Sequence, residues 1–151
     1  MSLDQKSMSM KRCLKYRKKI LDISQQVSAL HVAPAFSCLE IVDLIYHRLL
    51  RYSKPLNSYK DYFIMSKGHG SLSQYVILED LNIIQSNDLE NYCKKGGILG
   101  AHPDRGNPGI LASTGSLGHG LGLSVGMSYA ERIKNTDALT FVLLSDGELQ
   151  E

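Results

Sequence analysis

The sequence predicts an α/β domain, on the strength of three observations. The run Leu139–Leu144 is short, apolar and rich in β-branched and aromatic residues, and it ends in Ser-Asp-Gly, which is typical of a buried strand. A second short strand is predicted at Asp61–Met65, and it leads directly into a glycine-rich turn and a helical pattern. From Lys11 onward, apolar residues recur at spacings of three and four, which indicates an amphipathic helix.

The composition describes an ordinary globular domain. The 151 residues are 43% hydrophobic and 21% charged, which fits one domain with a real core. The net charge of +2 gives no reason to expect a nucleic-acid or membrane partner. Three cysteines without paired spacing predict reduced thiols, and no membrane span or signal peptide is evident in the sequence. We therefore expect a cytoplasmic protein.

The first predicted helix follows a polar segment, Met1–Met10, which we expect to be a flexible N-terminus. We expect the helix to run from Lys11 to about Leu30, because Pro34 disfavours helical backbone at Ala33. One face carries its apolar side chains, which are Cys13, Tyr16, Ile20, Ile23, Val27 and Leu30.

A capping-box pattern, Ser37-Cys38-Leu39-Glu40, predicts the start of a second helix. This start places His31 in a loop between two helices. Such a histidine is either simply exposed or part of a site, and the local sequence leaves both interpretations open. A polar connection containing Pro55 and Asn57 is predicted at Tyr52–Lys60.

The segment Ser66–Ser71 is predicted to join the strand Asp61–Met65 to a helix. A strand, a glycine turn and a helix N-terminus form an arrangement that binds anions, because free backbone N–H groups and the helix dipole both favour phosphate. Gly68 and Gly70 permit close approach and His69 adds a donor. An ordinary capped helix start is the alternative.

The middle of the chain contains a short predicted helix and a long loop. The helix, Ser86–Tyr92, is expected to be capped by Ser86 or Asn87. Gly100–Gly109 is dense in glycine and proline and lacks periodicity, so we expect an irregular loop, which in a compact domain is usually functional or mobile.

A glycine-rich segment begins at Thr114, and its helical part is predicted to run to about Lys134. Each glycine inside a helix costs roughly 1 kcal/mol relative to alanine. We therefore expect the shared face to pack closely against another backbone, within the fold or across a subunit interface. The face is formed by Gly118, Gly122, Gly126 and Ala130.

Asp146 follows the last predicted strand, at its carboxyl end. Ligands of open α/β sheets bind at that end of the strands. A carboxylate there, followed by glycine, suits a hard cation such as Mg²⁺ that carries a phosphate. Asp-Gly is also a common turn, so the dipeptide alone leaves both interpretations open.

Five motifs in order resemble the diphosphate-binding section of transketolases. They are the His31 loop, Ser66-Lys67-Gly68-His69, Gly100-Ala101-His102-Pro103, Thr114-Gly115-Ser116-Leu117-Gly118, and Ser145-Asp146-Gly147-Glu148-Leu149-Gln150-Glu151. The resemblance covers nearly the whole chain from about Lys11. It implies an α/β thiamine-diphosphate-binding fold whose mainly parallel sheet is flanked by helices and is incomplete at the C-terminus.

The resemblance also implies a function and a set of site residues. A transketolase transfers a two-carbon ketol unit from a ketose phosphate to an aldose, using thiamine diphosphate and Mg²⁺. By resemblance, His31 and His102 bind substrate and shuttle protons, and Asp146 binds Mg²⁺. The same comparison assigns cofactor binding to His69, Gly115, Ser116, Leu117 and Gly147.

The resemblance implies partners as well. Residues 1–151 would form part of a diphosphate-binding domain, as the N-terminal subunit or a fragment of a split transketolase. The chain alone is expected to be inactive, because the pyrimidine-binding section and a later Asn ligand are missing. We expect a homo- or hetero-oligomer, with Glu151 at an interface and sugar phosphates as substrates.

Two alternatives remain open. One is a truncated non-catalytic remnant or partner-binding module. The other is the α subunit of a 2-oxo-acid dehydrogenase, against which Glu148-Leu149-Gln150 argues, because that family usually has a different motif after Asp-Gly.

Overall fold

The computed structural model describes residues 3–27, 31–53 and 58–151. Its α-helices are α1 (Leu3–Ser24), α2 (Val32–Leu44), α3 (Ser71–Asp80), α4 (Ser86–Glu90) and α5 (His119–Ile133). Its strands are β1 (Tyr52–Ser53), β2 (Ser58–Tyr59), β3 (Tyr62–Met65) and β4 (Thr140–Leu143). A π-helical turn, η1 (Ile45–Leu49), continues α2, and two 3₁₀ turns follow the longer strands, η2 (Gly68–Gly70) and η3 (Gly147–Gln150).

The strands β3 and β4 form a parallel pair, which confirms the predicted α/β class. Their register runs from Tyr62 opposite Thr140 to Met65 opposite Leu143. The short strands β1 and β2 pair separately and are antiparallel. Since β3 and β4 are parallel, their carboxyl ends lie at the same edge. Whatever follows the two strands is therefore brought together.

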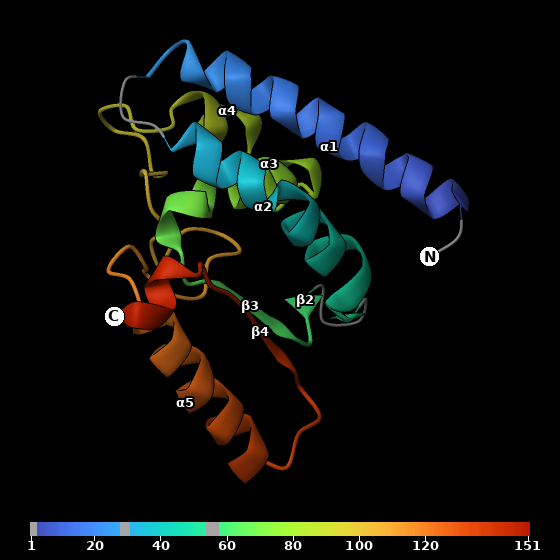
Figure 1. The fold of residues 1–151 in the computed structure, drawn as a ribbon, viewed down its shortest axis with the longest axis vertical. Coiled ribbons are helices and arrows are strands. Elements are labelled where there is room, and N and C mark those ends of the chain that lie inside the picture. Colours follow the sequence, from blue (N-terminus) through green and yellow to red (C-terminus); the bar gives the residue numbers. More distant parts are fainter. Residues whose placement is uncertain (1–2, 28–30, 54–57) are drawn as a thin grey trace.

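Helices cover both faces of this pair (Figure 1). The helices α1 to α4 gather on one side of the strands and α5 lies on the other. Phe63 and Met65 belong to the core shared with the first helices. Tyr62 points its hydroxyl to Glu131 of α5, at 3.1 Å. The helix α3 is buried along Ser71–Leu78, because α1, α2 and α4 pack around it.

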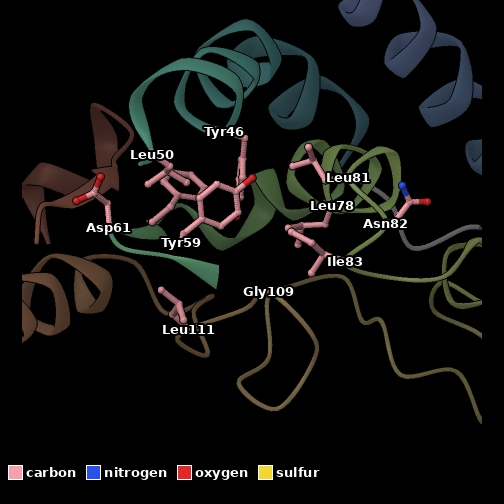
Figure 2. A pocket seen from close by; sticks show the side chains of 11 residues that line it. Tyr46, Leu50, Tyr59, Asp61, Leu78, Leu81, Asn82, Ile83, Gly109 and Leu111 are labelled. Atoms are coloured by element: carbon pink, nitrogen blue, oxygen red, sulfur yellow. The ribbon is translucent and has the colours of Figure 1, made fainter. Parts of the chain in front are cut away.

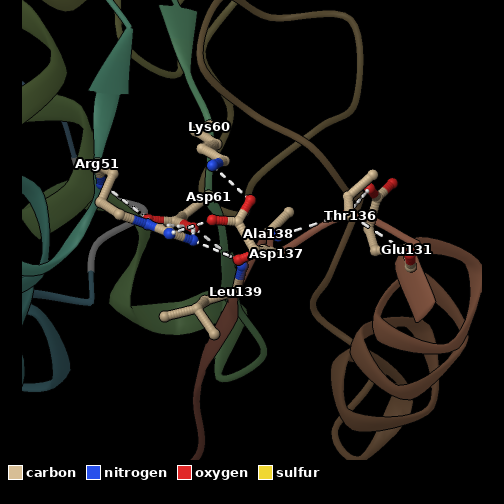
Figure 3. A network of polar contacts seen from close by, with 8 residues as sticks. All are labelled: Arg51, Lys60, Asp61, Glu131, Thr136, Asp137, Ala138 and Leu139. Carbon is tan, nitrogen blue, oxygen red and sulfur yellow. Dashed lines mark hydrogen bonds and ion pairs between the residues drawn. The ribbon is translucent and has the colours of Figure 1, made fainter. Parts of the chain in front are cut away.

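The buried carboxylate of Asp61 connects the starts of β3 and β4 through hydrogen bonds (Figure 3). Asp61 accepts hydrogen bonds from the Arg51 guanidinium at 2.5 and 2.8 Å and from the Leu139 N–H at 2.9 Å. Arg51 reaches on to Asp137 at 3.0 Å, and Lys60 pairs with the same carboxylate. The Arg51 guanidinium lowers the pKa of Asp61 to about 2. This end of the sheet is thus held by charge-assisted hydrogen bonds.

The first helix begins at Leu3 and not at Lys11 as predicted, because a tertiary anchor reaches into the polar segment. Asp43, buried in α2, accepts hydrogen bonds from Ser9 at 2.6 Å and from Arg12 at 2.7 and 2.9 Å. The flexibility expected of residues 1–10 stays a prediction. The helix ends at Ser24, and the predicted end at Leu30 lies outside the described residues. The predicted connection Tyr52–Lys60 includes the short strands β1 and β2, and its middle, 54–57, also lies outside the described residues.

The predicted start of the second helix at Ser37 is wrong. The helix α2 begins at Val32, so Pro34 lies in its first turn, where a missing N–H costs no internal hydrogen bond. The Ser37 hydroxyl donates to the Pro34 carbonyl at 2.8 Å and caps nothing. As a consequence, His31 stands directly at the N-terminus of α2 rather than in the middle of a loop.

Other local predictions are partly confirmed. The predicted end of α5 agrees with the structure, where Lys134 follows its last residue and Asn135 has φ +55°. The short helix α4 is capped by Gln85 and not by Ser86 or Asn87, because Asp88 accepts the Gln85 N–H at 3.1 Å. The strand β4 is half-buried and not fully buried, since β3 is the only strand paired with it in the described residues.

The glycine face of α5 differs from the expectation of packing within the fold. A Cβ built on Gly122 or Gly126 would meet no atom within 4 Å, and both glycines are exposed. Val125, Tyr129 and Ile133 are also exposed on this helix. The close approach instead occurs at Gly120, which packs against Ser66 at the end of β3. Contact of the glycine face across a subunit interface stays a prediction.

Candidate functional site

The site is built where the chain leaves β3. The Ser66 and Lys67 N–H groups both donate to the Leu143 carbonyl, at 3.0 and 3.3 Å, so the parallel pairing extends past the strand. The chain then turns through η2 into α3, as the sequence predicts. Gly68 and Gly70 in this turn are buried.

A second segment crosses this turn at close range. A Cβ on Gly68 would lie 2.8 Å from the Thr114 carbonyl carbon and from the Gly115 nitrogen, so only glycine fits there. The Thr114 hydroxyl donates to the Met65 carbonyl at 2.7 Å. Gly115 itself has φ +147°, a conformation that favours glycine. Backbone contact therefore fixes the Thr114–Gly115 loop against the end of β3.

Three predicted site histidines form one cluster. The ring centroids of His31 and His69 are 5.9 Å apart, and those of His31 and His102 are 5.3 Å apart. They come from the start of α2, from η2 and from the irregular loop after α4. The loop is held in place because Tyr75 donates to the His102 carbonyl at 2.9 Å and Ser71 donates to the Ala101 carbonyl at 2.8 Å.

The surroundings of His69 and His102 favour neutral imidazoles. The pKa of His69 is lowered, first by burial and then by the charges of Lys67 and His31. The pKa of His102 is lowered by burial and by His31. A neutral imidazole has one ring nitrogen that donates and one that accepts, so each of these rings is able to take up a proton.

Asp146 and Gly147 lie at the same edge of the sheet, after β4. Both are exposed, and a Cβ on Gly147 would meet nothing within 4 Å, so the backbone here is open to a ligand. Asp146 therefore lies at the same end of the sheet as His69 and the Thr114–Gly115 loop. Ser116 is exposed and Leu117 half-buried in the adjoining segment.

The donor set fits a diphosphate with a hard cation. Within the described ranges, no three His, Cys, Asp or Glu side chains are placed to hold a metal ion together. Mg²⁺ is usually bound through one or two carboxylates together with phosphate oxygens and water, so Asp146 is compatible with it. Gly147 leaves its backbone free of side-chain cover, which is the environment that a phosphate needs.

A larger cavity lies elsewhere and contains none of the predicted site residues (Figure 2). It measures about 810 Å³ and is lined mainly by apolar and aromatic side chains of η1, β2, β3, α3 and the turn after α3, with the 109–111 segment. Its carboxylate, Asp61, is already bound by Arg51. A smaller cavity of about 540 Å³ is lined by residues 93–104 and includes His102. We place the site at the strand ends because several polar groups converge there.

One residue of the site has no distinguishing signal in the sequence. Glu148 is buried beneath the strand ends and accepts hydrogen bonds from three separate segments. In the sequence it is one of several acidic residues in a polar turn, and no periodicity marks it as buried. His119, at the first position of α5, is exposed.

No helix in the described part of the chain has the length and apolar character required to cross a membrane.

Known proteins resemble this chain over nearly its whole length. Residues 4–151 match the family described as transketolase, thiamine diphosphate binding domain. The chain is 37% identical over 139 residues to one subunit of the apulose-4-phosphate transketolase of Phocaeicola vulgatus, and the match covers 91% of this chain and 50% of that protein. It is 32% identical to the transketolase of Buchnera aphidicola, covering 87% of this chain and 22% of that protein.

A solved structure agrees with these matches. The transketolase from Leishmania mexicana superposes with a TM-score of 0.82 at 27% sequence identity, covering 95% of this chain and 23% of that one. The chain thus spans about half the length of the apulose-4-phosphate transketolase polypeptide and about a fifth of the longer transketolases. On the family match and these likenesses, the chain belongs to the transketolase family, in its thiamine diphosphate binding domain.

Proposed function

We propose that this chain is the diphosphate-binding part of a transketolase that acts together with a pyrimidine-binding section or polypeptide. The observation that carries the proposal is the convergence of Asp146, His69 and the Thr114–Gly115 loop at one edge of the β3–β4 pair. The relative from Phocaeicola vulgatus is itself named as one subunit of a transketolase, and its match takes in 91% of this chain, which supports a two-chain assembly.

Thiamine diphosphate would supply the carbon nucleophile that takes a two-carbon ketol unit from a ketose phosphate and passes it to an aldose. Asp146 would bind the Mg²⁺ that accompanies the diphosphate. His69 and the backbone of Gly115 and Gly147 would hold the phosphate oxygens, with Ser116 and Leu117 beside them. Ser116, Asp146 and Gly147 are exposed in the structure, and Gly115 lies against the glycine turn that carries His69.

His31 and His102 would bind the sugar and move protons. Their rings lie 5.3 Å apart, which lets both approach one small substrate. The lowered pKa of His102 favours the neutral form, which accepts a proton from a substrate hydroxyl. Their assignment rests on the cluster geometry together with the family membership of the chain.

Cofactor binding tests the proposal directly. We expect the complete assembly to bind thiamine diphosphate only in the presence of Mg²⁺, and Asp146→Asn to weaken that binding at least tenfold in a calorimetric titration. Glu90→Gln, an exposed acidic residue of α4, is the matched control and should bind normally. Unchanged affinity in Asp146→Asn would refute the metal assignment.

Ketol transfer tests the need for a partner. The purified 151-residue chain, supplied with thiamine diphosphate and Mg²⁺, should not transfer a ketol unit from a ketose phosphate to an aldose. Adding the pyrimidine-binding polypeptide should restore transfer. Activity of the chain alone would contradict the two-part arrangement.

A further inference from the structure

Glu148 is the buried carboxylate that joins the pieces of the site. Only 2% of the Glu148 surface is exposed to solvent. Its Oε1 accepts a hydrogen bond from the Ser66 hydroxyl at 2.5 Å and from the Gly118 N–H at 2.9 Å. Its Oε2 accepts the Ser145 N–H at 3.2 Å. A carboxylate has two oxygens that accept several donors, so one side chain is able to satisfy all three groups.

The three donors belong to segments that are far apart in the sequence. Ser66 is 82 residues from Glu148 and directly follows β3, while Gly118 is 30 residues away and precedes α5. Ser145 lies just beyond β4. The carboxylate also lies at the N-terminus of a 15-residue helix, whose dipole favours a negative charge there. These contacts offset the cost of burying the charge.

Each donor adjoins a group that the proposed function assigns to the cofactor. Ser145 and Glu148 bracket Asp146 and Gly147. Gly118, with φ +82°, directly follows the Gly115–Leu117 segment. Ser66 begins the turn that carries His69. The Glu148 carboxylate is therefore hydrogen-bonded to a residue beside each of the three predicted cofactor-binding segments, and it connects them to one another.

We propose that Glu148 is a positioning residue: its carboxylate holds the end of β3, the start of α5 and the Asp146–Gly147 turn in the arrangement that receives the diphosphate. This inference rests on the proposed function. Both Glu148 oxygens accept hydrogen bonds from within the chain, so Glu148 acts on the cofactor through the segments that it joins. Its effect should appear in cofactor affinity more than in substrate affinity.

Glutamine at this position tests the hydrogen-bond pattern at nearly constant size. Its single oxygen can accept from Ser66 and Gly118, but its NH₂ group then faces the Ser145 N–H. In the flipped orientation the NH₂ faces the Gly118 N–H instead. Either way two donors oppose each other, and one buried N–H loses its acceptor. Ser66→Ala removes one donor only and leaves both backbone bonds intact.

The experiment compares Glu148→Gln, Ser66→Ala and the control Glu90→Gln in the complete assembly. Calorimetry with thiamine diphosphate and Mg²⁺ gives the cofactor Kd, and steady-state kinetics at saturating cofactor give KM for the ketose phosphate. We expect Glu148→Gln to raise the cofactor Kd at least tenfold and to change KM less than twofold. Ser66→Ala should have a smaller effect on Kd, and Glu90→Gln none.

The outcomes separate the inference from the function on which it rests. If the unmodified assembly binds no thiamine diphosphate, the proposed function is wrong and the role of Glu148 falls with it. If the unmodified assembly binds the cofactor and Glu148→Gln binds it equally well, only the positioning role is refuted. A lower melting temperature in Glu148→Gln with an unchanged Kd would show that the carboxylate is merely structural.

Discussion

Gly120 marks the tightest crossing between α5 and β3, and alanine there should destabilise the chain. A Cβ on Gly120 would lie 2.3 Å from the Ser66 Oγ, 2.5 Å from its Cβ and 2.6 Å from its Cα. Ordinary contacts between carbon atoms lie at about 3.5–4.0 Å. The helix and the end of β3 would therefore have to separate by roughly an ångström.

The magnitude follows from two opposing effects. Overpacking a close contact typically costs about 1–3 kcal/mol. The higher helix propensity of alanine returns up to about 1 kcal/mol. We therefore expect Gly120→Ala to lower the free energy of unfolding by roughly 1–2 kcal/mol, which for a chain of this length is a fall in Tm of roughly 2–8 °C.

Gly122→Ala is the matched control, two residues further along the same helix. A Cβ there would meet nothing within 4 Å, so only the propensity gain remains. We expect its Tm to rise, by up to about 4 °C. Thermal unfolding of the 151-residue chain, followed by circular dichroism, compares the two variants. A Gly120→Ala chain that melts at or above the unmodified chain would refute the close-packing argument.

Three further predictions concern charge and assembly. Asp61→Asn should lower the free energy of unfolding at pH 7 by roughly 2 kcal/mol, because the pKa of Asp61 lies at about 2 in the folded chain and near its ordinary value of 3.8 in the unfolded chain. This contribution is present above about pH 4 and is lost as the pH falls towards 2, so urea unfolding of the two proteins should converge near pH 2. The ring signals of His69 and His102 should titrate below pH 6.5 by NMR, since burial disfavours both imidazolium forms, and titration above that value would contradict the described burial. In the complete assembly, Gly122→Leu should lower the Tm or abolish dimerisation, and an unchanged assembly would show that the exposed glycine face contacts no other polypeptide.

The sequence was most informative where the local chemistry is decisive. Both longer strands, the glycine turn after β3 and the end of α5 follow from short patterns, and a parallel pair then forces their carboxyl ends together. The beginning of α2 could not be predicted, because Pro34 is compatible both with a helix end and with a first helical turn.

Tertiary contacts explain what the sequence did not reveal. The first helix extends to Leu3 because Asp43 anchors Ser9 from another helix, a contact that no local pattern signals. Spacing alone indicated that Gly118, Gly122 and Gly126 share a face, but the helix approaches β3 through Gly120. Glu148 was overlooked for the same reason, since its three partners meet only in the folded chain.

The parallel pairing also has a consequence for the order in which the chain folds. The Ser66–Glu148 bond joins residues 82 apart in the sequence, so the chain must close a long loop before the site exists. The Ser9–Asp43 contact between α1 and α2 spans 34 residues and the Cys38–Ser73 contact between α2 and α3 spans 35, and local contacts form sooner in general. We therefore expect the diphosphate-binding edge to be completed late, after the main folding barrier. Substitutions there would mainly accelerate unfolding and leave the folding rate almost unchanged.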